Sequence, residues 1–183
     1  MVRPSLATMV ALFALALVGC ATPAVIPPAG PPSDEQPLFA TDEEALAAAT
    51  EAYEEFLAAL DIALAVPDDS NEKLDEFAGG EVLNDARTAI DTFRDLGWRA
   101  VGVRQVVSSM LQQVVREAES TVVTIYVCES AEGVEVLDQS GESQVSEDRQ
   151  DLTGFEVSVS FATVSDALIE DRAQWPAADV CDL

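Results

Sequence analysis

The chain has 183 residues, with 34 acidic residues against 9 basic ones, a formal net charge of −25 and no histidine. Nucleic-acid binding needs a basic surface, so this composition excludes nucleic acid as a partner, and it disfavours anionic lipid and wall polymers. The lack of histidine excludes Ser-His-Asp and Cys-His catalysis, histidine general bases and His-ligated zinc. The acidity is typical of a soluble, self-repelling surface; a specific cationic ligand is the alternative.

Residues 1–19 have the pattern of an export signal. Arg3 and the terminal amine give a positive start, and the chain then runs from Leu6 to Gly19 without a charge. This run is shorter than the about 20 residues of a membrane-spanning helix, but it suits the apolar core of a signal peptide. We therefore predict that this segment directs export.

The apolar run ends in Leu17, Val18, Gly19 and Cys20. This sequence resembles the bacterial lipobox, and the resemblance implies cleavage before Cys20 and a thioether-linked diacylglycerol on its sulfur. Two acyl chains suffice for stable anchoring, so the mature protein is expected on the outer face of the cell membrane. An uncleaved anchor and an ordinary signal peptide are the alternatives.

Residues 20–41 are predicted to be the lipidated cysteine and a flexible tether. The tether is rich in proline: Pro23, Pro27, Pro28, Pro31, Pro32 and Pro37. Proline does not fit the interior of helices or sheets, and such runs favour extended polyproline geometry. At about 3.1 Å per residue, the segment would hold a domain roughly 60 Å from the bilayer. A disordered spacer whose length has no role is the alternative.

Residues 42–183 are long enough for one domain with a sizeable core. Beyond Cys20, this part of the chain contains the only other cysteines, Cys128 and Cys181. Two cysteines in an exported domain more often form a disulfide than a reactive or metal-binding pair. We therefore predict a Cys128–Cys181 disulfide, and we expect no metal and no cofactor.

The first half of this domain is predicted to be helical. Thr41 can cap a helix, with Glu44 three residues on and acids along the first turn. Apolar residues then recur at helical spacing as far as Pro67: Leu46, Ala49, Tyr53, Phe56, Leu57, Leu60 and Leu64. A short helix with Leu74 and Phe77 should follow, and then a third helix over residues 82–93 that Gly97 ends.

The acidic loop over residues 68–72 raises the possibility of a calcium site. EF-hand spacing counted from Asp69 fails, because Leu74 stands where glycine is needed and Gly80 stands where the bidentate glutamate is needed. A helix cap in a solvated loop is the better interpretation.

From Trp98 the pattern favours β-strands. We predict a long β-rich segment over 101–115, a strand over 121–128, a short piece over 134–137, a strand over 155–161 and a final strand over roughly 172–181. Residues 155–161 alternate between apolar and polar, as in a strand with one solvated face. Helices followed by antiparallel strands predict an α+β fold, with the helices packed on one face of a curved sheet.

The helix over 42–66 has an apolar stripe too wide to leave in water, and the strands have one face that needs covering. We therefore expect the helix to bury its stripe against inward strand residues: Val103, Ile125, Val127, Val157, Val159 and Phe161. Its acidic residues should face solvent: Glu43, Glu51, Glu54 and Glu55.

The whole chain resembles small secreted lipoproteins with a nuclear transport factor 2-like domain, which are common in high-GC Gram-positive bacteria. Beyond the lipobox and the spacer, the matching motifs are Tyr53-x-x-Phe56, Pro67-Asp68-Asp69, Gly97-Trp98-Arg99-x-x-Gly102, Val127-Cys128 and Cys181. The resemblance implies a cystatin-like cone, in which a bent sheet wraps the first helix and leaves a pocket at the open end. Because such relatives include isomerases, dehydratases and proteins without known catalysis, it implies a shape and not an activity.

Two functions from different classes remain. The first is a non-catalytic envelope lipoprotein whose cone binds a partner protein or a small apolar ligand. The second is a pocket enzyme similar to isomerases or dehydratases, which needs a carboxylate base in an apolar cavity and a tyrosine or protonated acid as hydrogen-bond donor.

The candidate pocket-lining residues are aromatic: Tyr53, Tyr126 and Trp98, with Trp175 as a further candidate for a pocket mouth. Packing in the core or at the rim is the default interpretation of each. Asp61 lies two turns beyond Tyr53 and is expected to be solvated. Since no catalytic constellation is evident, we predict a non-catalytic module. Convergence of a tyrosine, a carboxylate and an apolar cavity would favour the enzyme instead.

Overall fold

The computed structural model describes residues 37–67, 72–176 and 180–182. The predicted signal peptide, the lipobox with Cys20 and most of the tether lie outside the described residues, as do residues 68–71 of the acidic loop. The elements in chain order are α1 (Asp42–Ala65), η1 (Glu72–Glu76), α2 (Gly80–Leu96), β1 (Arg99–Val101), β2 (Gln105–Arg116), β3 (Thr121–Ser130), β4 (Glu135–Leu137), β5 (Leu152–Thr163) and β6 (Asp166–Gln174).

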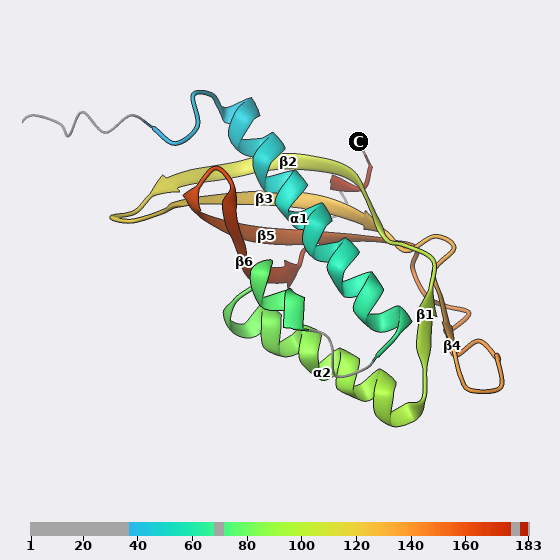
Figure 1. Ribbon diagram of the computed structural model, residues 1–183. Coiled ribbons are helices and arrows are strands. Elements are labelled where there is room, and N and C mark those ends of the chain that lie inside the picture. The colour runs from blue at the N-terminus through green and yellow to red at the C-terminus, as the bar shows by residue number, and fades with distance from the viewer. Residues whose placement is uncertain (1–36, 68–71, 177–179, 183) are drawn as a thin grey trace, which may run out of the picture. The chain divides into compact units, whose positions relative to one another are not determined.

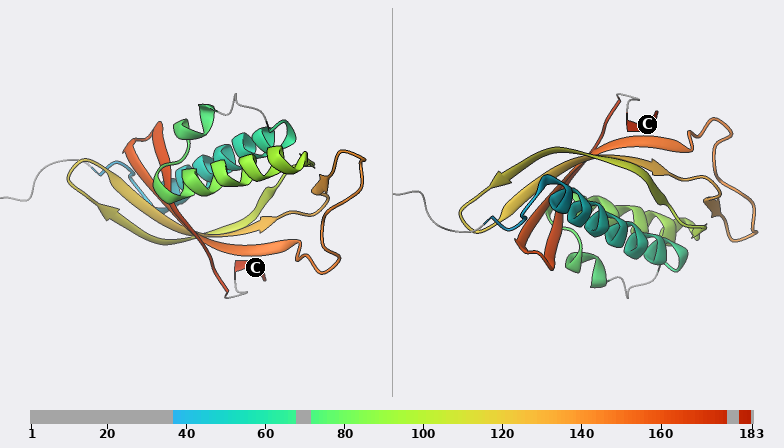
Figure 2. Two further views of the ribbon diagram at one scale, coloured as in Figure 1. Left: turned by 90° about the horizontal axis from the view of Figure 1, so that it is seen from below. Right: turned by 90° about the horizontal axis from the view of Figure 1, so that it is seen from above.

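The main sheet is antiparallel and has the strand order β2-β3-β5-β6, while β1 and β4 form a separate two-stranded ribbon. Helices α1 and α2 lie against one face of the main sheet, and the ribbon lies at one end of it (Figure 1). The views from below and above show the sheet curving around the helices, with the C-terminal end on its opposite face (Figure 2). The predicted α+β architecture is therefore confirmed.

Helix α1 begins where the sequence predicted. Thr41 is its N-cap, and its side-chain Oγ1 accepts a hydrogen bond from the backbone N–H of Glu44 at 3.2 Å. The Glu44 carboxylate accepts in turn from the backbone N–H of Ala40 at 2.7 Å. Together these bonds satisfy two backbone donors at the start of the helix. Three acids in the first turn also lie at the positive end of the helix dipole.

The core lies between α1 and the inward faces of β3 and β5. Ile125 pairs with Val157 and Val123 pairs with Val159 across the two strands, and all four side chains are fully buried. The apolar stripe of α1 covers them as expected, with Tyr53, Phe56, Leu57 and Leu60 buried. Leu46 and Leu64 are only partly buried at its edges. The four glutamates expected in solvent are all exposed.

The predicted strand over residues 101–115 is wrong at its start, because the chain bends at Gly102. This glycine has φ +98°, and a Cβ there would lie 2.7 Å from the carbonyl oxygen of Gly133. Only glycine fits that close approach of two backbones. The bend ends β1 at Val101 and starts β2 at Gln105. It also turns Val103 outward, 62% exposed, so the expected packing of Val103 against α1 is wrong.

The predicted final strand over residues 172–181 is also wrong. Strand β6 runs instead from Asp166 to Gln174 and forms a hairpin with β5, in which Thr163 pairs with Asp166. The two residues of the turn, Val164 and Ser165, include none of the glycine, asparagine or aspartate that normally indicate such a turn. The apolar residues of β6 are mostly consecutive, Ala167 to Ile169, and only Ile169 is fully buried, so hydrophobic alternation did not reveal the strand.

The C-terminal segment lies on the outer face of the sheet, away from the helices. Cys128 on β3 forms a disulfide with Cys181, with a Cα–Cα distance of 5.0 Å, so the predicted pairing is present. The Ser108 hydroxyl on β2 donates to the carbonyl oxygen of Val180. The disulfide closes a loop with a sequence separation of 53, for which the chain-entropy model gives roughly 4 kcal/mol of stabilisation.

Candidate functional site

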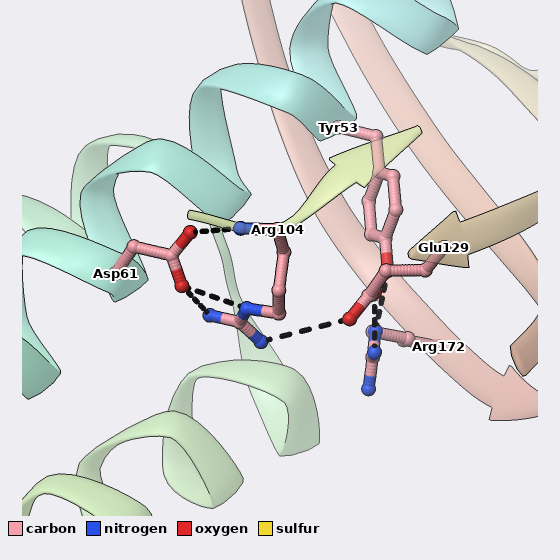
Figure 3. Close-up of polar contacts among 5 residues, drawn as sticks. All are labelled: Tyr53, Asp61, Arg104, Glu129 and Arg172. Carbon is pink, nitrogen blue, oxygen red and sulfur yellow. Dashed lines mark hydrogen bonds and ion pairs between the residues drawn. The ribbon is translucent and has the colours of Figure 1, made fainter. Parts of the chain in front are cut away.

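The most distinctive polar feature of the domain is a group of side chains inside the curve of the sheet (Figure 3). We call it the interior polar cluster, and its members are Tyr53, Asp61, Arg104, Glu129 and Arg172. Helix α1 supplies the tyrosine and the aspartate, β3 supplies the glutamate, and β6 supplies Arg172. Arg104 lies in the bend between β1 and β2.

Strand geometry explains why two of these charged residues point inward. Side chains of a strand alternate between its two faces, so Glu129 shares the inward face of β3 with Ile125 and Val127. Arg172 pairs with the inward Val157 across the β5–β6 ladder, which places it on the same face of the sheet. Arg104 is brought to this face by the bend at Gly102.

Asp61 and Arg104 form a tight ion pair at one side of the cluster. Asp61 Oδ1 accepts a hydrogen bond from Arg104 Nε at 2.7 Å and lies 2.6 Å from Nη2. Asp61 Oδ2 accepts from the backbone N–H of Arg104 at 2.8 Å. The Asp61 side chain is 8% exposed and that of Arg104 is 16% exposed. The aspartate therefore fixes both the side chain and the backbone of the bend.

Glu129, Tyr53 and Arg172 form a triangle of hydrogen bonds at the other side. The Tyr53 hydroxyl donates to Glu129 Oε2 at 2.8 Å and accepts from Arg172 Nε at 2.6 Å. Arg172 Nη2 donates to the same carboxylate oxygen at 2.8 Å. The guanidinium also lies 3.6 Å from the ring centroid of Phe155, which adds a cation–π contact.

The two halves of the cluster are linked, because Arg104 Nη1 lies 3.8 Å from Glu129 Oε1. Two arginines therefore face two carboxylates, and the cluster is neutral as a whole. This balance matters because a buried charge is tolerated only when it is paired and hydrogen-bonded. The cluster is a closed set of ion pairs.

Burial and partners shift the pKa values of two members of the cluster. Burial raises the pKa of the Tyr53 phenol far above its usual range, so it remains a hydrogen-bond donor at physiological pH. Burial alone would lower the pKa of the Arg172 guanidinium, but Tyr53 and Glu129 raise it and the net direction is upward. Both shifts keep the triangle in the protonation state that its hydrogen bonds require.

A groove of about 340 Å³ reaches one side of the cluster. Asp61 and Arg104 line it together with Leu57 and Val106. Tyr53 and Glu129 are not among its lining residues, and Tyr53 is fully buried behind Glu129. Solutes in this groove therefore meet an aspartate that Arg104 already engages at both oxygens.

The structure separates the aromatic residues that the sequence suggested as a pocket lining. Tyr53 lies in the core, with its hydroxyl in the interior polar cluster. Tyr126 lies on the outer face of β3, where its ring is 4.8 Å from that of Trp175. Trp98 lies beyond the end of α2 with its ring 6.0 Å from that of Phe93. Tyr53, Tyr126 and Trp98 therefore do not line one pocket, although Tyr126 and Trp175 pack against each other.

Asp61 is the clearest correction among the candidate residues. It was expected to be solvated, but it is buried and paired with Arg104. The sequence reasoning also missed Arg104, Glu129 and Arg172. The alternation of inward and outward residues in β3, continued beyond Val127, would have placed Glu129 inward. Arg104 could not be placed in this way, because it follows a bend that the hydrophobic pattern does not show.

No protein-family model matches the sequence, and no curated protein sequence matches it. Among solved structures, the chain is similar to the crystal structure of the intermembrane space region of the chloroplast protein ARC6. The identity is 16%, the TM-score is 0.51, and the match covers 72% of this chain and 97% of that chain. A second match is the crystal structure of CagV, a VirB8 homolog of T4SS from Helicobacter pylori strain 26695. Its identity is 13% and its TM-score is 0.36, over 70% of this chain and 96% of that chain.

The likeness to the ARC6 region is one of fold: the domain has the nuclear transport factor 2-like arrangement of helices packed on one face of a curved antiparallel sheet. Within the described residues, no helix combines the length and apolar character needed to cross a membrane.

Proposed function

We propose that the protein is an extracytoplasmic lipoprotein, anchored through Cys20, whose nuclear transport factor 2-like domain is a non-catalytic interaction module. The lipobox-like run from Leu17 to Cys20 supports the anchor. The Cys128–Cys181 disulfide supports an oxidising compartment outside the cytoplasm, since structural disulfides are rare in reducing compartments.

One observation carries the non-catalytic part of the proposal: the interior polar cluster is closed. An enzyme of the isomerase or dehydratase type needs a carboxylate base that can reach its substrate in an apolar cavity. Tyr53 and Glu129 do meet within hydrogen-bond distance, as that alternative requires. However, Arg172 donates hydrogen bonds to both the Tyr53 hydroxyl and the Glu129 carboxylate. The adjacent groove is lined by Asp61 and Arg104 and not by Tyr53 or Glu129. The pair therefore serves packing and charge balance.

Two experiments test this proposal. Mass spectrometry of the membrane fraction should find a diacylated N-terminal Cys20 peptide, and Cys20→Ser should abolish that species. An intact Met1 in the membrane-bound form would overturn the anchor. For the domain, NMR titration with 2-naphthol, a planar phenol that mimics an enolate intermediate, should leave the signals of Tyr53 and Glu129 unchanged. Saturable shifts at both residues would establish an accessible catalytic pocket and overturn the non-catalytic assignment.

A further inference from the structure

A second groove lies away from the interior polar cluster, where α1, the end of η1 and the β5–β6 turn meet. Its volume is about 470 Å³, which falls within the range of ligand-binding clefts. Its apolar lining residues, which we call the floor, are Ala48 and Ala52 of α1 with Phe77 and Phe161. Phe161 is 1% exposed and belongs to the core, so this floor is part of the rigid body of the domain.

Four carboxylates stand around this floor: Glu51, Glu55, Glu76 and Asp166. They come from α1, from η1 and from the start of β6, and all four residues are exposed. Among the described residues, no ion pair joins any of them to a lysine or arginine. We call this surface the acidic groove. It contrasts with the interior polar cluster, in which each carboxylate has an arginine partner.

Helix α1 supplies both apolar and acidic residues to the groove from one side of the helix. Ala48 and Ala52 are four residues apart, as are Glu51 and Glu55, so the two pairs lie side by side along α1. The small alanine side chains let another chain approach closely. Like charges at this spacing repel each other, and the repulsion is relieved when a cation binds between or beside them.

We propose that the acidic groove binds a basic amphipathic segment of a partner protein, with an apolar side chain on the floor and lysine or arginine side chains on either side. This proposal rests on the interaction module proposed above and names the chemistry of its partner. Apolar contact with the floor and charge complementarity at the rim together give such an interface both affinity and selectivity.

The arrangement of the carboxylates favours a peptide over a metal ion. Within the described residues, no three acidic or other metal-ligating side chains are grouped closely enough to hold a metal. The charges instead come from three separate elements, α1, η1 and β6, that line the groove together with the apolar floor. Several separate cationic groups on one chain can each meet a different carboxylate, and the long aliphatic stems of lysine and arginine can cover the floor between them.

The test uses the purified full chain, in the N-terminal form that the cell produces, and calorimetry in about 150 mM salt, where surface attraction at long range is screened. The probe is the peptide acetyl-Lys-Leu-Lys-Leu-Lys-amide. It should bind with 1:1 stoichiometry and shift the NMR signals of Ala48, Ala52 and Ala167. The peptides with glutamate in place of lysine and with glycine in place of leucine should bind at least tenfold more weakly. So should spermidine, which has charge without an apolar side chain.

Matched variants separate the acidic groove from the general acidity of the protein. E51Q/E55Q should weaken probe binding at least tenfold. E81Q/D85N removes the same charge from exposed positions on α2 and should change it less than about twofold. Thermal unfolding verifies that both variants stay folded. The proposal is overturned by an absence of probe binding, by equal losses in the two variants, or by equal binding of the glycine peptide or spermidine. In each of these cases a lipidated Cys20 and a silent Tyr53 signal would still leave the proposed function in place.

Discussion

The inward face of strand β3 has an apolar end and a charged end, and the two ends are buried in different ways. Along β3, Val123, Ile125 and Val127 point into the core and are fully buried. Glu129 continues the same alternation and is also buried, with 7% exposed. The valines and the isoleucine need only the apolar stripe of α1 above them. Glu129 needs specific partners, and it takes them from α1, from the bend before β2 and from β6.

The difference matters for stability, because an apolar neighbour can be replaced by another of similar size, whereas a charge partner cannot. Removing one member of a buried ion pair leaves the other charge without compensation. Removing an apolar side chain costs its transfer free energy and the cavity that remains. Stability should therefore depend on the exact residue types in the interior polar cluster, whereas in the apolar core it should depend mainly on the size of the side chain.

The largest loss is expected for Glu129→Ala. The variant leaves the half-buried Arg104 and Arg172 with Asp61 as the one remaining acid of the interior polar cluster. Breaking a buried pair in this way costs about 3–5 kcal/mol. Urea unfolding followed by circular dichroism measures it, and Glu132→Ala, an exposed position just beyond β3, is the matched control. A loss below about 1 kcal/mol would mean that solvent reaches the arginines and that the cluster is open.

The apolar end is tested by Leu60→Ala. Leu60 is 8% exposed on the inner face of α1, so truncation should cost about 2–5 kcal/mol of unfolding free energy. Ile62 on the same helix is 72% exposed, so Ile62→Ala should cost less than about 0.5 kcal/mol. Equal effects in the two variants would place this helix on the surface and contradict the core described here.

Tyr53→Phe tests the hydrogen-bond triangle with a smaller perturbation. The variant keeps the packed ring and removes one buried hydroxyl, so it should cost about 1–3 kcal/mol at neutral pH. Arg172 still engages Glu129 after this change, so the loss should stay below that of Glu129→Ala.

The same residue predicts a pH dependence at the alkaline end. Burial raises the pKa of Tyr53 in the folded state, whereas the unfolded phenol has a pKa of about 10. The corresponding stability is complete below that value and declines as the pH rises above it toward the folded pKa, by up to about 1.4 kcal/mol per pH unit. Tyr53→Phe should remove the part of this decline that belongs to Tyr53. Tyrosinate absorbance at pH near 10 that is equal in folded and unfolded protein would contradict the raised pKa.

Sequence pattern gave reliable information where one physical effect dominates. The cap at Thr41, the apolar stripe of α1 and the alternation in β3 and β5 each depend on a regular period, and the structure confirms them. The strand β6 was missed because it is an edge strand whose apolar residues do not alternate with polar ones, and because no recognisable turn precedes it. Local sequence does not encode such tertiary pairing.

The interior polar cluster was harder to predict for a related reason. Its hydrogen bonds join residues 43 to 119 positions apart, and no period in the sequence links them. Asp61 looks like any helix acid in a chain with so many, and only the position of Arg104 after the bend at Gly102 gives it a buried role. The three-dimensional arrangement determines which charged residues pair. A single sequence therefore shows which residues are charged but not which of them form ion pairs.

The smallest effect is expected for Glu51→Ala, and its value lies in the contrast with Asp61→Ala. Both acids are on α1, but Glu51 is exposed without an ion-pair partner among the described residues, whereas Asp61 is buried against Arg104. Exposed substitutions of this kind change stability by less than about 0.5 kcal/mol. Alanine is also a strong helix former, and the change lowers the repulsion between Glu51 and Glu55, so a slight gain is expected. Asp61→Ala leaves the half-buried Arg104 with only the longer 3.8 Å contact to Glu129 and should cost about 3–5 kcal/mol. Urea unfolding of the two variants measures this contrast. Losses of similar size would mean that burial does not distinguish the acids of this helix. They would also mean that the interior polar cluster does not stabilise the fold.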